Sequence, residues 1–380
     1  MCAVLALSGS GYRVIAQELP PDAPAPPVAP AADPFAVPKG TAEELLKYVD
    51  ELRRAQPTSE SREVVMEFLH KRAVALLKAA ESILAAGPNA EQLKAAVQYK
   101  IAALAMLDRL GEPGMGRRLE ALPAALERAG LKELALAARC AALQSRLRSV
   151  ETMSPKDLGQ LFDEVARCLK QSGSDPNVIQ LAVSAAMSAE SSNRPEMAIR
   201  AYTQFGTILA GGSDEKTAGL GAAMQGAVRR LGLLGKTMPL EAATLDGKPF
   251  QWKAYRGKVV LIDFWATWCG PCREELANIE KNYKAYHDRG FEVVGISIDQ
   301  DRQALEDFLE KNEHPWTVLH DNVAANGTAK SMSTYYGILG VPAMILVGRD
   351  GKVVCLNARG PQLGKELEKL LGPSTAKDEG

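Results

Sequence analysis

The chain has 380 residues, which is enough for about two domains of ordinary size. Hydrophobic residues make up 46% of it and charged residues 24%, the composition of a folded globular protein. The formal net charge is -1, and nothing in the composition argues for a nucleic-acid or acidic-membrane partner, so no nucleic acid is predicted. The six cysteines are too few and too scattered for a disulfide scaffold, and no apolar run is long enough for a membrane-spanning helix.

The first 16 residues are mostly apolar, and Val14 and Ala16 fit the small-residue pattern that precedes signal-peptidase cleavage. The basic start of a signal peptide is missing. Two interpretations therefore stay open: a signal peptide whose true start lies upstream of Met1, or a disordered leader on a cytosolic protein. Residues 17–40 are rich in Pro and Ala, which predicts an extended linker without a packed core.

Residues 41–234 carry a helical pattern, because apolar residues recur every three or four positions. Thr41 and Glu44 form a capping box at its start. The predicted helices cover 41–55, 59–86, 89–110, 114–129, 131–149, 154–171, 177–190, 195–209 and 214–234. Short loops favour antiparallel pairs, either in an irregular bundle or in a degenerate α-solenoid of the tetratricopeptide type. Cys140 and Cys168 are predicted to be buried free thiols, with a disulfide between them as the alternative.

Residues 235–373 alternate between strand and helix patterns, and a tail of residues 374–380 follows. We expect a short β-hairpin over 238–250 that turns at Asp246-Gly247. The expected strands are 259–265, 291–297, 316–319, 343–347 and 353–356, and the expected helices are 269–289, 301–312, 330–336 and 362–371. The chain is thus predicted to be a multidomain protein, with an all-α domain followed by an α/β domain whose sheet is covered on both faces.

The most informative stretch is a buried strand that breaks after Trp265 and continues through Cys269-Gly-Pro-Cys272 into an amphipathic helix. Two cysteines at this spacing can close a small disulfide ring. Cys269 lies where free backbone N–H groups and the helix dipole stabilise a thiolate, so we predict it as the nucleophile. Cys272, in the first turn, suits the role of resolving thiol. Gly270 and Pro271 keep the turn compact.

Two other uses of this cysteine pair have to be weighed, a structural disulfide and half of a zinc site. A zinc site needs about four ligands. The sequence has no second Cys-x-x-Cys pair, and its four histidines show no ligand spacing. A redox couple is therefore the favoured interpretation, and no metal is predicted.

The run from Trp268 to Cys272, with the strand before it, resembles the active site of the thioredoxin superfamily. The longer segment from Gly257 to Glu275 is similar to the TlpA-like, extracytoplasmic branch, although that branch often has Asn where this chain has Asp263. The resemblance covers roughly 235–372. It implies a thioredoxin-like fold, a redox-active Cys269–Cys272 disulfide and no bound cofactor. It also implies a periplasmic or other extracytoplasmic compartment, with a cytoplasmic location as the alternative.

The same resemblance assigns roles to neighbouring residues. Asp263 would relay a proton to or from Cys272, and burial in an apolar strand would raise its pKa. The alternative is that Asp263 only fills a polar gap. Glu275 would tune the pKa values of the site, or else be a solvated charge that stabilises the helix N-terminus.

The resemblance also predicts how a substrate docks. A cis-proline at Pro342 would face the cysteines, and its backbone groups would pair with the substrate chain. Val341, next to it, is predicted as a further substrate-binding residue. Trp268, Gly270 and Pro271 would line the docking surface, with ordinary packing as the alternative for Trp268.

Three functions follow from these residues. The leading one is a thiol–disulfide oxidoreductase that reduces protein disulfides and receives electrons from a membrane thiol reductase or a thioredoxin-type protein. A thiol peroxidase is the second, but that family has Thr three residues before its reactive cysteine, and this chain has Ala266. The third is a non-enzymatic protein whose helical domain binds a partner.

Overall fold

The computed structural model describes residues 33–192, 194–321 and 331–374. The predicted signal peptide and most of the predicted linker lie outside the described residues, as do the predicted helix start at Lys330 and almost all of the tail. The chain divides into two compact units, residues 1–93 and residues 94–380. Within the described residues, no helix has the length and apolar character that crossing a membrane would need.

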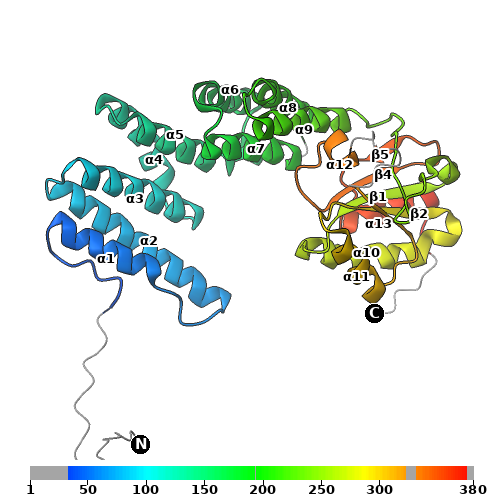
Figure 1. The fold of residues 1–380 in the computed structure, drawn as a ribbon, viewed down its shortest axis with the longest axis horizontal. Coiled ribbons are helices and arrows are strands. Elements are labelled where there is room, and N and C mark those ends of the chain that lie inside the picture. The colour runs from blue at the N-terminus through cyan, green and yellow to red at the C-terminus, as the bar shows by residue number, and fades with distance from the viewer. Residues whose placement is uncertain (1–32, 193, 322–330, 375–380) are drawn as a thin grey trace, which may run out of the picture. The chain divides into compact units, whose positions relative to one another are not determined.

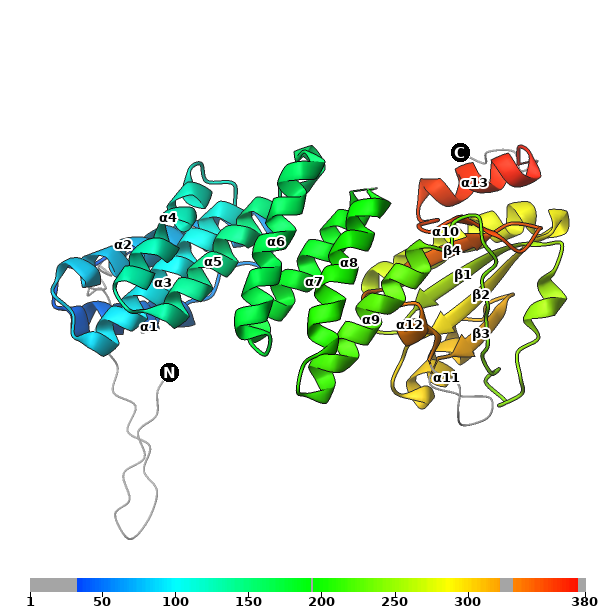
Figure 2. The same cartoon turned by 90° about the horizontal axis from the view of Figure 1, so that it is seen from above.

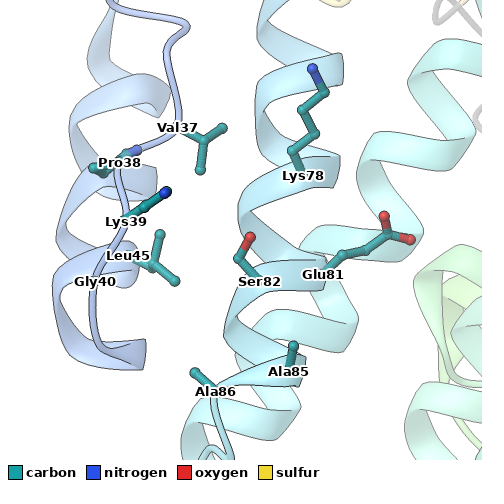
Figure 3. A pocket seen from close by; sticks show the side chains of 10 residues that line it. All are labelled: Val37, Pro38, Lys39, Gly40, Leu45, Lys78, Glu81, Ser82, Ala85 and Ala86. Carbon is teal, nitrogen blue, oxygen red and sulfur yellow. The ribbon is translucent and has the colours of Figure 1, made fainter.

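The first unit contains α1 (Ala42–Arg54), α2 (Arg62–Ala85) and the start of α3 (Ala90–Arg109). The predicted capping box is confirmed, because Thr41 accepts a hydrogen bond from the Glu44 amide and Glu44 accepts one from the Thr41 amide. The end of the predicted linker contacts these helices: the Phe35 ring meets the Phe68 ring edge-on, with 5.6 Å between centroids. An open pocket of about 740 Å³ lies beside this segment (Figure 3) and is lined by Val37, Pro38, Lys39, Gly40, Leu45, Lys78, Glu81, Ser82, Ala85 and Ala86.

The second unit continues with α4 (Met115–Arg128), α5 (Lys132–Leu147), α6 (Pro155–Ser172), α7 (Pro176–Ser191), α8 (Pro195–Ala210) and α9 (Glu215–Leu231). Each agrees with a predicted helix to within a few residues at its ends. Their starts follow the sequence signals, since α6, α7 and α8 each have proline in the first turn. Helices α7, α8 and α9 lie side by side (Figure 2).

Cys140 and Cys168 lie in the core of these helices, and both are free thiols. The alternative of a disulfide between them is therefore wrong. Burial raises the pKa of Cys140 to about 12, so this thiol stays protonated near neutral pH and is a poor nucleophile.

The α/β part has a mixed sheet in the order β3-β2-β1-β4-β5. Figure 1 labels β2, β1, β4 and β5 of this sheet. The strands are β1 (Val259–Trp265), β2 (Phe291–Ser297), β3 (Thr317–His320), β4 (Ala343–Val347) and β5 (Val353–Cys355). β1, β2 and β3 are parallel, whereas β4 and β5 are antiparallel to their neighbours. The helices are α10 (Gly270–Tyr286), α11 (Arg302–Lys311), α12 (Met332–Tyr335) and α13 (Pro361–Leu371).

Two predictions for this part need correction. The predicted strand 316–319 begins one residue later, at Thr317. The predicted hairpin over 238–250 is reduced to one bridge between Ala243 and Pro249, closed by the turn at Asp246-Gly247. Gly247 has φ of +80° there, a conformation that glycine adopts without strain.

The two faces of β1 pack against different elements. Val259 and Leu261 share a core with α10 and α13, whereas Val260, Ile262 and Phe264 share one with α12 and the segment around Leu233 to Leu240. Burial of each large side chain contributes roughly 1.5–3 kcal/mol. Because side chains alternate along a strand, Asp263 lies on the α10 side of the sheet, which brings its carboxyl to the helix that carries the cysteines.

A polar junction joins the helices of the second unit to its α/β part. Arg230 on α9 forms a two-pronged ion pair with Glu190 on α7, at 2.6 and 3.0 Å, and its Nε donates to the carbonyl oxygen of Tyr336 at 3.2 Å. Tyr202 donates to the same Glu190 carboxylate at 2.9 Å. The Arg230 side chain is only 7% exposed, so this pair is held away from water.

We predict that Arg230→Ala lowers the free energy of unfolding by about 3 kcal/mol, because Glu190 is left partly buried without its cation. Urea unfolding measures the change. The control is Arg200→Ala, since the Arg200–Asp163 pair is about half exposed and its loss should cost under about 1 kcal/mol. Equal losses in the two variants would contradict the description of Arg230–Glu190 as an ion pair shielded from water.

Candidate active site

The two cysteines lie at the start of α10, just after the turn that connects it to β1. Cys269 is the N-cap residue of α10, and Cys272 is in its first turn. Their sulfurs form a disulfide with an S–S distance of 2.02 Å. The backbone amide of Cys272 points at Sγ of Cys269 and lies 3.2 Å from it. In the reduced protein this N–H and the helix dipole would stabilise a thiolate at Cys269.

The surroundings of the disulfide leave one side open. Cys269 is 5% exposed and Cys272 is 2% exposed, so Cys269 is the less buried of the two. Trp268 is 67% exposed, Pro271 is exposed, and a side chain at Gly270 would meet no neighbour. The alternative in which Trp268 is ordinary packing is therefore wrong, and these three residues form an accessible rim next to Cys269.

The loop before β4 comes from a distant part of the chain and closes the site. The Val341–Pro342 peptide bond is cis, as the resemblance implied. The carbonyl oxygen of Val341 lies 3.7 Å from Sγ of Cys269. A chain bonded to Cys269 would therefore have to pass over this loop.

Asp263 is a buried carboxyl group, only 3% exposed to solvent. Burial raises its pKa to about 7, and the nearby charge of Glu275 adds to the increase. Its Oδ1 atom is buried and has no hydrogen-bond partner among the described residues. An acid that titrates near neutral pH can both accept and return a proton, which is the property that a proton relay requires.

Glu275 does not fit the second of its two predicted roles, that of a solvated charge at the helix N-terminus. Glu275 is only 8% exposed, so its carboxylate is largely shielded from water. Its Oε1 accepts hydrogen bonds from Asn278 at 2.6 Å and from the Gly360 amide at 2.8 Å, and Oε2 lies 3.7 Å from Arg359. Glu275 thus ties α10 to the loop before α13 while its charge acts on Asp263.

Asp299 is a site residue that the sequence interpretation missed. Its carboxylate accepts hydrogen bonds from the amide and hydroxyl of Thr267 at 3.0 and 2.6 Å and from Ser297 at 2.7 Å. Asp299 thereby fixes the turn that leads from Trp265 to Cys269. The signal was available, because β1 and β2 are parallel neighbours and a polar residue just after β2 must lie near the end of β1.

Other chemistries find little support in the described residues. No group of three or more His, Cys, Asp or Glu side chains within 33–374, apart from the undescribed gaps, is arranged to hold a metal ion. Ala266, at the position where a thiol peroxidase would have Thr, is fully buried.

Comparisons with known proteins identify the α/β part. The sequence model of the Redoxin family matches residues 233–371. The thiol-disulfide oxidoreductase ResA of Bacillus thuringiensis subsp. konkukian is 31% identical over 139 residues, which are 36% of this chain and 76% of the relative. ResA of Bacillus anthracis is 33% identical over a segment of the same length, with the same coverage.

A solved structure covers the same part of the chain. The thioredoxin domain of a thiol-disulfide oxidoreductase from Bacteroides vulgatus is 30% identical, with a TM-score of 0.33 over 36% of this chain and 97% of that domain.

The raised pKa of Asp263 makes stability depend on pH. The folded pKa of about 7 lies above the unfolded value near 3.8, so the folded protein binds more protons between these pH values and loses stability as pH rises from about 4 to 7. Asp263→Asn cannot ionise and should remove this loss. At pH 8 the oxidised variant should be more stable by about 4 kcal/mol, and at pH 4 the difference should be small.

Urea unfolding of the disulfide form at several pH values measures this difference. A gap between wild type and Asp263→Asn that is the same at pH 4 and pH 8 would contradict a titrating Asp263.

We also predict that Asp299→Asn loosens the turn before Cys269, because the amide and hydroxyl of Thr267 lose a charged acceptor. Hydrogen exchange at the Thr267 amide should speed up, and stability should fall by about 2–3 kcal/mol. Thr267→Val is the matched control, since it removes the hydroxyl but keeps the amide contact, and its cost should be near 1 kcal/mol. Faster exchange in the control than in Asp299→Asn would contradict the assignment.

Proposed function

The chain belongs to the family of thiol-disulfide oxidoreductases that includes the ResA proteins, and on that premise we propose that it reduces disulfide bonds in other proteins. One observation carries the proposal: the Cys269–Cys272 disulfide lies at the N-terminus of α10, beside the cis Val341–Pro342 bond and an exposed Trp268. A sulfur in that place is activated by the helix and is reached over an open rim.

The proposed reaction moves two electrons from the cysteine pair to the substrate. The Cys269 thiolate attacks one sulfur of the substrate disulfide, the substrate S–S bond breaks, and the departing thiolate takes a proton from solvent. This step leaves a mixed disulfide on Cys269. The Asp263 carboxylate then accepts the proton of the Cys272 thiol, and the Cys272 sulfur attacks Sγ of Cys269. The disulfide between Cys269 and the substrate breaks, the departing substrate thiolate takes a proton from solvent, and Asp263 later releases its proton to solvent. The substrate leaves as a dithiol, and the protein is left with its own disulfide.

The reducing direction rests on two features of this site. The Gly270-Pro271 dipeptide is the one found in thioredoxin, which has a potential of about −270 mV. Asp263 can hold the proton of Cys272 because the pKa of its carboxyl is about 7. A peroxidase is disfavoured by Ala266, which has no hydroxyl to offer a peroxide.

We extend the proposal to the surroundings in which the protein works. An extracytoplasmic compartment fits the apolar leader and the Pro/Ala-rich linker of the sequence. In an oxidising compartment the disulfide formed in each cycle has to be reduced by a donor, either a membrane thiol reductase or a thioredoxin-type protein. Cell fractionation tests the compartment, and recovery in the cytosol with residues 1–16 still attached would refute it.

We predict that the wild-type protein, supplied with dithiothreitol, reduces the disulfides of insulin, and that Cys269→Ser and Cys272→Ser both abolish turnover. Cys272→Ser should still form a mixed disulfide, because the nucleophile remains, whereas Cys269→Ser should form none. The midpoint potential of the pair, measured against a dithiothreitol buffer, should lie near −270 mV.

A midpoint near −120 mV would reverse the direction and make the protein a disulfide donor. The absence of any reversible disulfide would refute the enzyme assignment and favour partner binding by the helices.

A further inference from the structure

A methionine from the helical part of the second unit lies next to the loop that closes the redox site. Met187 is on α7, and a Cβ added to Gly340 would lie 3.3 Å from its terminal methyl carbon. Gly340 is exposed and directly precedes Val341, whose carbonyl oxygen is 3.7 Å from Sγ of Cys269. Cys269, the loop and Met187 therefore follow one another along a short path.

Several contacts hold the helical core and α9 against α12 and the loop that leads to Val341. The Arg229 guanidinium on α9 lies 4.2 Å from the centre of the Tyr335 ring on α12, and α9 runs beside α12 (Figure 2). Gly226 and Gly337 let the two backbones touch, since a Cβ on either would collide with the other element. Leu339, in the same loop, packs against the helical core. The position of Met187 beside the loop is thus fixed from several sides.

Met187 remains accessible although it sits in this packed region. Among the residues that the structure describes, four large hydrophobic side chains are exposed: Met66, Met187, Leu234 and Trp268. Met187 is 37% exposed and Trp268 is 67% exposed. Trp268 directly precedes Cys269 in the sequence. Met187 lies near Cys269 through the loop of Gly340 and Val341.

We propose that Met187 is a specificity-determining residue that contacts the polypeptide whose disulfide is exchanged. The inference rests on the proposed function. When the substrate cysteine is bonded to Cys269, its chain has to lie over Val341 and Gly340, and the next surface along this path is Met187. An unbranched thioether side chain adapts to different apolar partners. The favoured occupant is an extended segment with an apolar side chain close to its cysteine, which Trp268 and Met187 shield from water.

The experiment uses the full-length Cys272→Ser protein, in which the mixed disulfide cannot be resolved. Two peptides are compared, and each has one cysteine whose sulfur is bonded to thionitrobenzoate. In the Leu peptide this cysteine has Leu on both sides, and in the Asp peptide it has Asp on both sides. The Cys269 thiolate attacks the peptide sulfur, a peptide–Cys269 disulfide forms and coloured thionitrobenzoate leaves. Ellman's reagent serves as the small substrate without a peptide, and a protein that also carries Cys269→Ser gives the background from the other thiols.

With Met187 in place, the Leu peptide should react faster than the Asp peptide. Met187→Glu should lower the rate constant of the Leu peptide, relative to that of Ellman's reagent, by about tenfold, the factor that corresponds to partial burial of one apolar side chain. Met187→Leu should restore most of the ratio. Met66→Glu is the matched control, because Met66 is an exposed methionine on a helix of the first unit. In this variant the rate constant of the Leu peptide relative to that of Ellman's reagent should equal the value in the parent protein.

The outcomes separate the inference from the function. A parent protein that reacts with Ellman's reagent through Cys269, but shows the same peptide ratio after Met187→Glu, overturns the role of Met187 alone. A parallel fall with both peptides and the reagent overturns it as well, since that would be a change in Cys269 and not in docking. A parent protein with no reactive Cys269 overturns the proposed function and this inference together.

Discussion

The contact around which the α/β part is arranged joins the backbone amide of Cys272 to the sulfur of Cys269. The amide lies in the first turn of α10 and points at this sulfur. A helix N-terminus has free N–H groups that stabilise a negative charge, but only if the residue in front of it is held at the N-cap. Asp299 fixes the preceding turn through Thr267, and Glu275 fixes the following helix through the Gly360 amide. The parallel strands supply the first anchor, because β2 ends beside the end of β1, where the turn to α10 begins. The second anchor comes from the loop before α13.

The same arrangement includes a group that opposes folding. Placing Asp263 in the middle of β1 costs about 4 kcal/mol near pH 8, judged from the pKa of about 7 of its carboxyl. The other six residues of β1 are hydrophobic and fully or almost fully buried, and each contributes roughly 1.5–3 kcal/mol. A buried acid with a pKa near neutrality is the kind of group that the proposed proton transfer requires.

Much of this could be predicted from the sequence, because local signals decide helices and strands. The apolar run of β1, the Cys-x-x-Cys turn and the prolines that start α6 to α8 each depend on a few adjacent residues. Contacts between residues that lie far apart in sequence could not be predicted this way, as two examples show. The burial of Glu275 depends on Gly360, which lies 85 residues away in sequence, and the ion pair of Arg230 depends on Glu190, 40 residues away. Periodicity within one helix carries no information about such partners.

The Glu190–Arg230 pair also bears on why a helical region precedes the redox domain. An ion pair removed from water gives little net stability compared with apolar packing, but it is specific in its geometry. Here it joins α7 to α9 and, through the carbonyl of Tyr336, to the segment that leads to Val341. A flexible tether would leave the redox site to select substrates by its own rim alone. A geometrically defined junction instead holds α7 and α9 in a fixed position beside the segment that leads to Val341, which is what the proposed role of Met187 requires.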